Sequence, residues 1–308
     1  MHTHIYLFTG FHQSQRIQFI KNTITSTSFC DNQTTLIISD YSFSQDFLNQ
    51  YHCICEQFTD FHHLEHDIHR WDERYHPTQV LIETTDCHLL NHLFQTPWKE
   101  DWEIEQVTTF LNAQEFHHQM HDHVHELYHY LEHAHLVILD HIEESTSLDY
   151  CFNNIKAVQM NCTIICEHHN HTVSELKEGF LPYDINANPI ILDDHQFGAF
   201  GIDLMLQPQK YNHKTITIKG KFLGCDRFVE NGFVFGRQAY LCHHNPHSFI
   251  GMICIHPYAQ SFVLNEWLQL TGTLHIEYDE NAQLEYPLLV VDDLQVVPPL
   301  QDEYITFE

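Results

Sequence analysis

The stretch Ile5–Ile20, with the sequence IYLFTGFHQSQRIQFI, decides the fold expected for the N-terminal region. The apolar run from Ile5 to Phe8 predicts a buried strand, and Gly10 predicts a turn directly after it. Apolar residues between positions 17 and 20 then recur at roughly helical spacing. A strand, a turn and a helix in this order open many nucleotide-binding α/β domains, so we expect such a domain here.

The turn lies where a phosphate-binding loop of pattern G-x-x-x-x-G-K-[ST] would lie. Gly10 keeps the first position, but Gln15 replaces the second glycine and Ile17 replaces the hydroxyl that would bind magnesium. Arg16 replaces the lysine and keeps only its charge. We take Gly10, Ser14 and Arg16 as the candidate phosphate contacts. An ordinary strand–turn–helix explains the same residues.

Further short apolar runs alternate with helical patterns along residues 1–210, at residues 36–39, 80–82, 136–139 and 164–165. This alternation predicts an α/β domain with a P-loop-like, mostly parallel sheet and flanking helices. From Thr215 onward, alternating apolar residues and turn residues predict strands, so residues 211–308 are expected to form a small all-β, barrel-like domain.

The charge balance restricts the possible partners. Lysine and arginine number 13 and aspartate and glutamate 42, for a net charge of −29. This excess disfavours nucleic acids and anionic membranes and favours cations. No apolar stretch is long enough to span a membrane, and the start lacks the features of a signal peptide. The 10 cysteines are scattered. We expect a cytoplasmic protein with reduced thiols and no membrane insertion.

Histidine is the outlier of the composition, with 30 residues in 308, and it is the commonest metal ligand. The tightest group of potential ligands is Cys53-Ile54-Cys55, flanked by His52 and Glu56. On a loop, thiolates at i and i+2 can both point at one soft or borderline cation. The alternative is two unrelated buried cysteines.

A second group lies on a long amphipathic helix expected over residues 113–133. Five histidines at i, i+4 spacing share one stripe of this helix, namely His117, His121, His125, His129 and His133. Neighbouring imidazoles could share a weakly held, exchangeable cation. A solvated polar face explains the stripe equally well.

A third group lies in the β region, where Cys242 and His243 are followed by Cys254. Two strands could bring these residues together into a zinc site. A hairpin with one buried cysteine on each strand is the alternative.

In the order of these motifs, the N-terminal region resembles the CobW-like GTP-binding proteins, a metallochaperone-type branch of the P-loop GTPases. The residues HCICE at 52–56 resemble the family's metal-binding G-C-x-C-C, and IETT at 82–85 resembles its IETTG. The segment Leu139–Glu143 (LDHIE) stands in the place of the guanine-reading N-K-x-D without its Asn and Lys. The resemblance implies metal binding, and the altered nucleotide motifs leave binding of GTP and Mg²⁺ open.

Residues 215–308 resemble the C-terminal β domain of the YcgQ-like proteins. The matching features are Gly236-Arg237, Cys242, Trp267 with Gly272, and Pro298-Pro299. That resemblance implies a role in zinc homeostasis and a partner such as a membrane permease or a metal-receiving protein. Our hypothesis is a zinc-binding metallochaperone or buffer. The alternatives are a GTP hydrolase that uses Arg16 in place of the loop lysine, and an interaction scaffold without a metal role.

Overall fold

The structure is a computed structural model that describes residues 2–26, 29–30, 33–58, 63–96, 98–168, 172–239, 249–280, 282–305 and 307. The chain divides into two compact units. The first comprises residues 1–146 and 161–177, and the second comprises residues 147–160 and 178–308. This division differs from the predicted one at residue 210, because residues 147–160 and 178–210 belong with the β region.

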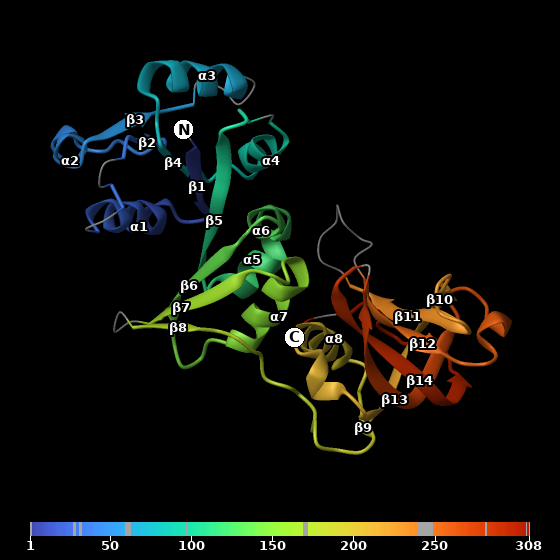
Figure 1. Ribbon diagram of the computed structural model, residues 1–308. Helices are drawn as coiled ribbons and strands as arrows, with labels where there is room; N and C mark the ends of the chain where they lie inside the picture. Colours follow the sequence, from blue (N-terminus) through green and yellow to red (C-terminus); the bar gives the residue numbers. More distant parts are fainter. Residues whose placement is uncertain are drawn as a thin grey trace. The chain divides into compact units, whose positions relative to one another are not determined.

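The first unit is built on an eight-stranded sheet with the strand order β3-β2-β4-β1-β5-β6-β7-β8 (Figure 1). All neighbouring strands are parallel except β8, which runs antiparallel to β7. The predicted mostly parallel sheet is therefore confirmed. The strands are β1 (Thr3–Gly10), β2 (Thr35–Ile38), β3 (Cys53–Glu56), β4 (Gln79–Glu83), β5 (Trp102–Asn112), β6 (Leu136–Ile142), β7 (Thr163–His168) and β8 (Val173–Glu175).

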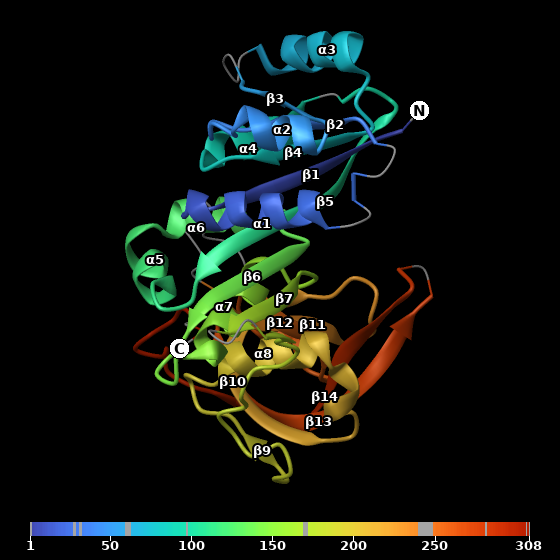
Figure 2. The same ribbon diagram turned by 90° about the vertical axis from the view of Figure 1, so that its left-hand side faces the viewer.

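Helices cover both faces of this sheet (Figures 1 and 2). Apolar side chains of α1 and α2 form one core cluster with the strands, and those of α3, α4 and α6 form another. Because β2 and β4 lie between the two clusters, every residue in them is buried, which explains their continuous apolar runs. The helices are α1 (Gln13–Thr25), α2 (Gln45–Gln50), α3 (Leu64–Tyr75), α4 (Cys87–Gln95), α5 (Phe116–Asp122) and α6 (Val124–Leu131).

The second unit contains a closed barrel of five strands, as predicted for the β region. The order around the barrel is β10-β11-β12-β14-β13, and β13 pairs with β10 to close it. Among the five described barrel strands, β12–β14 is the one parallel pair, which is the strand arrangement of an OB-fold barrel. The strands are β10 (Thr215–Cys225), β11 (Gly232–Gln238), β12 (Phe249–Ile255), β13 (Trp267–Asp279) and β14 (Leu284–Val296); the short β9 (Ile190–Ile191) joins β10.

Two α-helices of the second unit, α7 (Leu148–Val158) and α8 (Phe197–Leu206), pack on each other, and α8 packs on β12. The packing of α8 is close, since a Cβ added at Gly201 would meet Ile250 Cγ2 at 2.1 Å. Short 3-10 turns, η2 (Pro208–Tyr211) and η3 (Ala259–Ser261), complete the unit. None of the described helices is long and apolar enough to cross a membrane.

Candidate functional site

The turn between β1 and α1 keeps its glycine for a packing reason. Gly10 has φ +128°, and a Cβ at this position would lie 2.2 Å from the carbonyl oxygen of Phe110 in β5. β1 and β5 are paired at these two residues, so only glycine allows their backbones to approach this closely. The first glycine of the phosphate motif is thus explained by strand pairing without any ligand.

Arg16 is fully buried, and the protein itself supplies the partners of its guanidinium group. Its Nε donates to Glu83 Oε1 at 2.8 Å, and its Nη1 donates to the Gly10 carbonyl oxygen at 2.6 Å. The Ser39 hydroxyl donates to the second oxygen of Glu83 at 2.6 Å. Burial lowers the pKa of Arg16, and the Glu83 carboxylate opposes this shift. The charge of this arginine is therefore already paired with Glu83 inside the protein.

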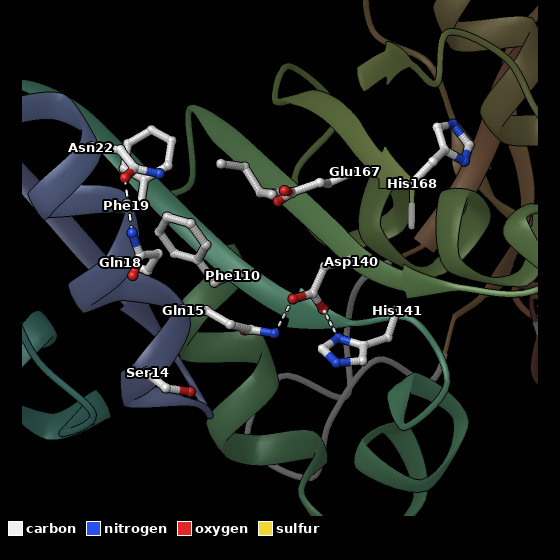
Figure 3. Close-up of a pocket in the computed structure, with 11 residues that line it drawn as sticks. Ser14, Gln15, Gln18, Phe19, Asn22, Phe110, Asp140, His141, Glu167 and His168 are labelled. Atoms are coloured by element: carbon white, nitrogen blue, oxygen red, sulfur yellow. Dashed lines mark hydrogen bonds and ion pairs between the residues drawn. The ribbon is translucent and has the colours of Figure 1, made fainter. Parts of the chain in front are cut away.

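A cavity of about 380 Å³ lies beside α1, at the carboxyl ends of β6 and β7 (Figure 3). The predicted phosphate contact Ser14 is exposed and lines this cavity. Asp140 and His141, from the segment compared above with a base-reading motif, line it as well. Gln15 donates to Asp140, and His141 Nδ1 lies 2.9 Å from the other oxygen of that carboxylate. The hydrogen bond to Asp140 raises the pKa of His141. Asp140 and Glu167 both line the cavity, and the two oxygens of Asp140 already contact Gln15 and His141.

Cys53 and Cys55 lie on β3, a strand at the edge of the sheet, whereas the sequence suggested a loop. Alternate residues of a strand face the same side, so both thiols point toward the core cluster under α1 and α2. Glu56 points to the other face, where its carboxylate accepts a hydrogen bond from Tyr75. His52 is exposed, with φ +54°. The structure therefore brings the two cysteines together but directs Glu56 away from them.

A third thiol, Cys30, joins this pair from the segment after α1. Thr35 of β2 is paired with Cys53 and donates to Cys30 Sγ at 3.7 Å. The pKa of Cys53 is raised to about 12, first by burial and then by the neighbouring thiols of Cys30 and Cys55. Burial and the adjacent Glu56 carboxylate raise the pKa of Cys55 to about 11. We call Cys30, Cys53 and Cys55 the thiol cluster; no local spacing in the sequence indicated its first member.

The histidine stripe is interrupted. Two helices, α5 and α6, replace the single helix expected over residues 113–133, and the chain breaks at His123, which has φ −131° and ψ +31°. His117 and His121 therefore lie on α5, while His125 and His129 lie on α6. The five histidines do not share one helical face.

The third predicted group is only partly described. Cys254 lies on β12, is fully buried, and has a pKa raised well above its usual range by that burial. Cys242 and His243 lie outside the described residues. Across the part of the chain that the structure describes, no three His, Cys, Asp or Glu side chains already converge as metal ligands.

Comparison with known proteins adds a domain family and several distant structures. Residues 169–306 match the family described as the DUF1980 C-terminal domain. No curated protein matches the chain. Solved structures with similarity include Zn(II)-bound YjiA GTPase from E. coli, at 11% identity over 73% of this chain and 74% of that chain, with a TM-score of 0.43.

Two further structures cover less of this chain. Hydrogenase maturation factor HypB from Archaeoglobus fulgidus is 14% identical over 55% of this chain and 82% of that chain, with a TM-score of 0.39. A small single-stranded DNA-binding protein from Streptomyces coelicolor is 13% identical over 28% of this chain and 95% of that chain, with a TM-score of 0.20. Similarities of this size say nothing about the ligands of this chain.

Proposed function

We propose that this protein binds zinc through the thiol cluster and buffers or delivers it, as a metallochaperone or zinc buffer in zinc homeostasis. The observation that carries the proposal is the placement of Cys53 and Cys55 on one face of β3, with Cys30 beside them. In this proposal zinc is the ion that the protein carries, and the GTPase-like fold positions the thiols that bind it.

The chemistry of the donor set fits this cargo. Cysteine thiolates bind Zn²⁺ at about 2.3 Å and favour soft or borderline metals over Mg²⁺ or Ca²⁺. The raised pKa values mean that the thiols hold their protons near neutrality, so zinc must replace these protons when it binds. Three thiols leave one of four zinc positions for water or for a ligand from a receiving protein. A cargo site needs such an exchangeable position.

The state of the nucleotide region supports a carrier over a hydrolase. Phosphoryl transfer needs positive groups directed at the transferred phosphate. Arg16 instead faces the Glu83 carboxylate and the Gly10 carbonyl oxygen. The rival proposal, a GTP hydrolase with Arg16 as the loop lysine, requires this buried pair to separate.

The proposed recipient is a metal-receiving protein, of which a membrane permease would be one form. We place the protein in the cytoplasm, where thiols remain reduced and able to bind metal. The net charge of −29 attracts cations to the chain and repels nucleic acids.

Calorimetric zinc titration of the metal-free protein at neutral pH, with and without GTP and Mg²⁺, tests this proposal. We expect one tight step that is lost in the double variant Cys53→Ser/Cys55→Ser. The matched control is Cys166→Ser, which removes a buried thiol on β7 whose pKa is likewise raised by burial. The control should keep the tight step.

Two results would change the conclusion. If the tight step survives loss of Cys53 and Cys55, or never appears, the thiol cluster is not the zinc site. If GTP with Mg²⁺ alters the zinc affinity and is turned over, and if Arg16→Ala abolishes that turnover, the hydrolase replaces the carrier as the better account.

A further inference from the structure

Two members of the thiol cluster are in direct contact although they lie far apart in the sequence. Cys30 and Cys53 are hydrogen-bonded to each other, and both pack in the core cluster under α1 and α2. Thr35 on β2 is paired with Cys53 across the sheet, and its hydroxyl lies 3.7 Å from Cys30 Sγ. The packing of the segment after α1 against the edge of the sheet therefore holds these two sulfurs together.

The hydrogen bonds of Cys53 direct its sulfur toward Cys30. Cys53 Sγ donates to the carbonyl oxygen of Tyr51 at 3.4 Å. Because a thiol carries one hydrogen, the contact between the two sulfurs uses the S–H of Cys30 and a lone pair of Cys53. This lone pair faces the sulfur atom with which Cys53 would form a disulfide.

The third thiol, Cys55, is placed differently. It follows Cys53 by two residues on β3, so their Cα atoms are about 6.6 Å apart and their side chains run parallel. A disulfide needs Cβ atoms about 3.8 Å apart, so joining these two thiols would require the strand to break. Cys30 lies outside the helices and strands and can approach Cys53 without disrupting the sheet. The geometry thus selects Cys30 and Cys53 as the pair.

The two sulfurs also differ in their access to solvent. Cys30 is partly exposed, whereas Cys53 is only 8% exposed. Oxidants react first with accessible thiols, and redox-sensing cysteines often lie beside a second thiol that resolves the oxidised one. In this pair Cys30 is the thiol that an oxidant reaches, and Cys53 is the resolving thiol.

We propose that Cys30 and Cys53 form a redox site in which a peroxide converts the two thiols into a disulfide. In the first step hydrogen peroxide transfers an oxygen atom to Cys30, which becomes a sulfenic acid, and one water leaves. In the second step the sulfur of Cys53 attacks the sulfur of Cys30, the S–O bond breaks, and the hydroxyl group leaves as water with the proton of Cys53. The two thiols lose two electrons, and the peroxide is reduced to two waters.

The disulfide would change what the thiol cluster can bind. It withdraws two of the three thiols, so oxidation would release zinc from the cluster; this consequence rests on the proposed function. Formation of the disulfide itself needs no zinc. Transient, redox-sensing disulfides are the kind that occur in the cytoplasm.

Peroxide treatment of the metal-free full chain, followed by peptide mapping with mass spectrometry, tests the pairing. The chain carries Cys225→Ser, which removes an exposed thiol at the end of β10. We expect a pair of peptides joined through Cys30 and Cys53 that separates on reduction with dithiothreitol. The matched control Cys55→Ser should give the same joined peptides. Joined peptides that contain Cys55, or loss of thiols without the Cys30–Cys53 pair, would overturn the redox site.

A second experiment identifies the thiol that reacts first. In Cys53→Ser/Cys55→Ser the neighbouring thiols of the cluster are gone, so dimedone, which labels sulfenic acids, should modify Cys30 during peroxide treatment. In Cys30→Ser the buried Cys53 should take up no label. Labelling of Cys53 in place of Cys30 would refute the assigned roles, and circular dichroism checks that both variants fold.

Zinc release separates this inference from the proposed function. Peroxide added to the zinc-loaded protein beside a chromogenic zinc chelator should release the metal, and dithiothreitol should restore binding. A Cys30–Cys53 disulfide that forms while zinc stays bound would contradict the thiol cluster as the zinc site and leave the redox site standing. Tight zinc binding through Cys53 and Cys55 without any disulfide in the metal-free chain would contradict the redox site alone.

Discussion

Replacement of Glu83 by glutamine is expected to destabilise the first unit strongly. Glu83 neutralises Arg16, which is fully buried, through contacts of 2.8 Å from Nε and 2.7 Å from Nη2 to the same carboxylate oxygen. Glutamine keeps the shape and one acceptor but leaves the guanidinium charge without a counter-charge. Breaking a buried ion pair on one side costs about 3–5 kcal/mol, so we expect the free energy of unfolding to fall by that amount.

A double variant measures how much of this loss comes from the unpaired charge of Arg16. Arg16→Met/Glu83→Gln removes both charges, and the glutamine can still hydrogen-bond to Ser39, which contacts Glu83 Oε2 at 2.6 Å. Replacing both members of a buried pair is often close to neutral. The double variant should therefore recover most of the stability, with a coupling energy of about 2 kcal/mol or more.

Urea unfolding followed by circular dichroism, together with hydrogen exchange of the β1 and β4 amides, measures these effects. Exchange is needed because the two units can unfold in separate transitions. A loss below about 1 kcal/mol in Glu83→Gln would refute the reasoning. It would mean that the Arg16 charge does not depend on Glu83, and the hydrolase alternative would regain support.

Two further predictions concern the backbone and the pH. Gly10→Ala should lower the free energy of unfolding by more than about 3 kcal/mol, because backbone strain at φ +128° adds to a 2.2 Å clash with the Phe110 carbonyl oxygen. Gly224→Ala, with φ +122° and open space around it, should lose only the strain of about 1–3 kcal/mol. Equal losses of the two variants in urea titrations would contradict this account. Folding raises the pKa of Cys53 from a usual 9.0 to about 12, and that of Cys55 from 9.0 to about 11. The two protonated thiols therefore contribute fully to stability below pH 9.0, and this contribution is lost as the pH rises toward the folded pKa values. The metal-free protein should lose stability over this alkaline range, and Cys53→Ala should lose less; identical pH profiles would show that the thiols do not contribute.

The N-terminal strand, turn and helix show which features the local sequence was able to predict. The apolar run Ile5–Phe8 and the helical spacing after Gly10 are local properties, and they predicted the strand, turn and helix that form. The sequence also showed Arg16 at the position where the predicted phosphate-binding loop would carry a lysine. The partner that neutralises Arg16 was not visible in the sequence, because Glu83 reaches it only through the pairing of β1 with β4.

The candidate metal ligands show a similar limit of prediction from local sequence. The direction of Glu56 away from Cys53 and Cys55 follows from strand alternation and was predictable once the segment is treated as a strand. The contribution of Cys30 was not predictable, since it depends on where the chain returns after α1. The break at His123 likewise depends on packing that periodicity alone does not report.

The sequence by itself determined the class of the fold and the kinds of ligand available. Continuous apolar runs specify strands buried on both faces, alternating runs specify a barrel, and charge and histidine content favour cations. Only the tertiary structure decided which ligands meet, and that the segment 147–160 belongs with the barrel unit. The physical reason is that periodicity fixes which face a side chain takes within its own element, whereas contact between elements depends on how they pack.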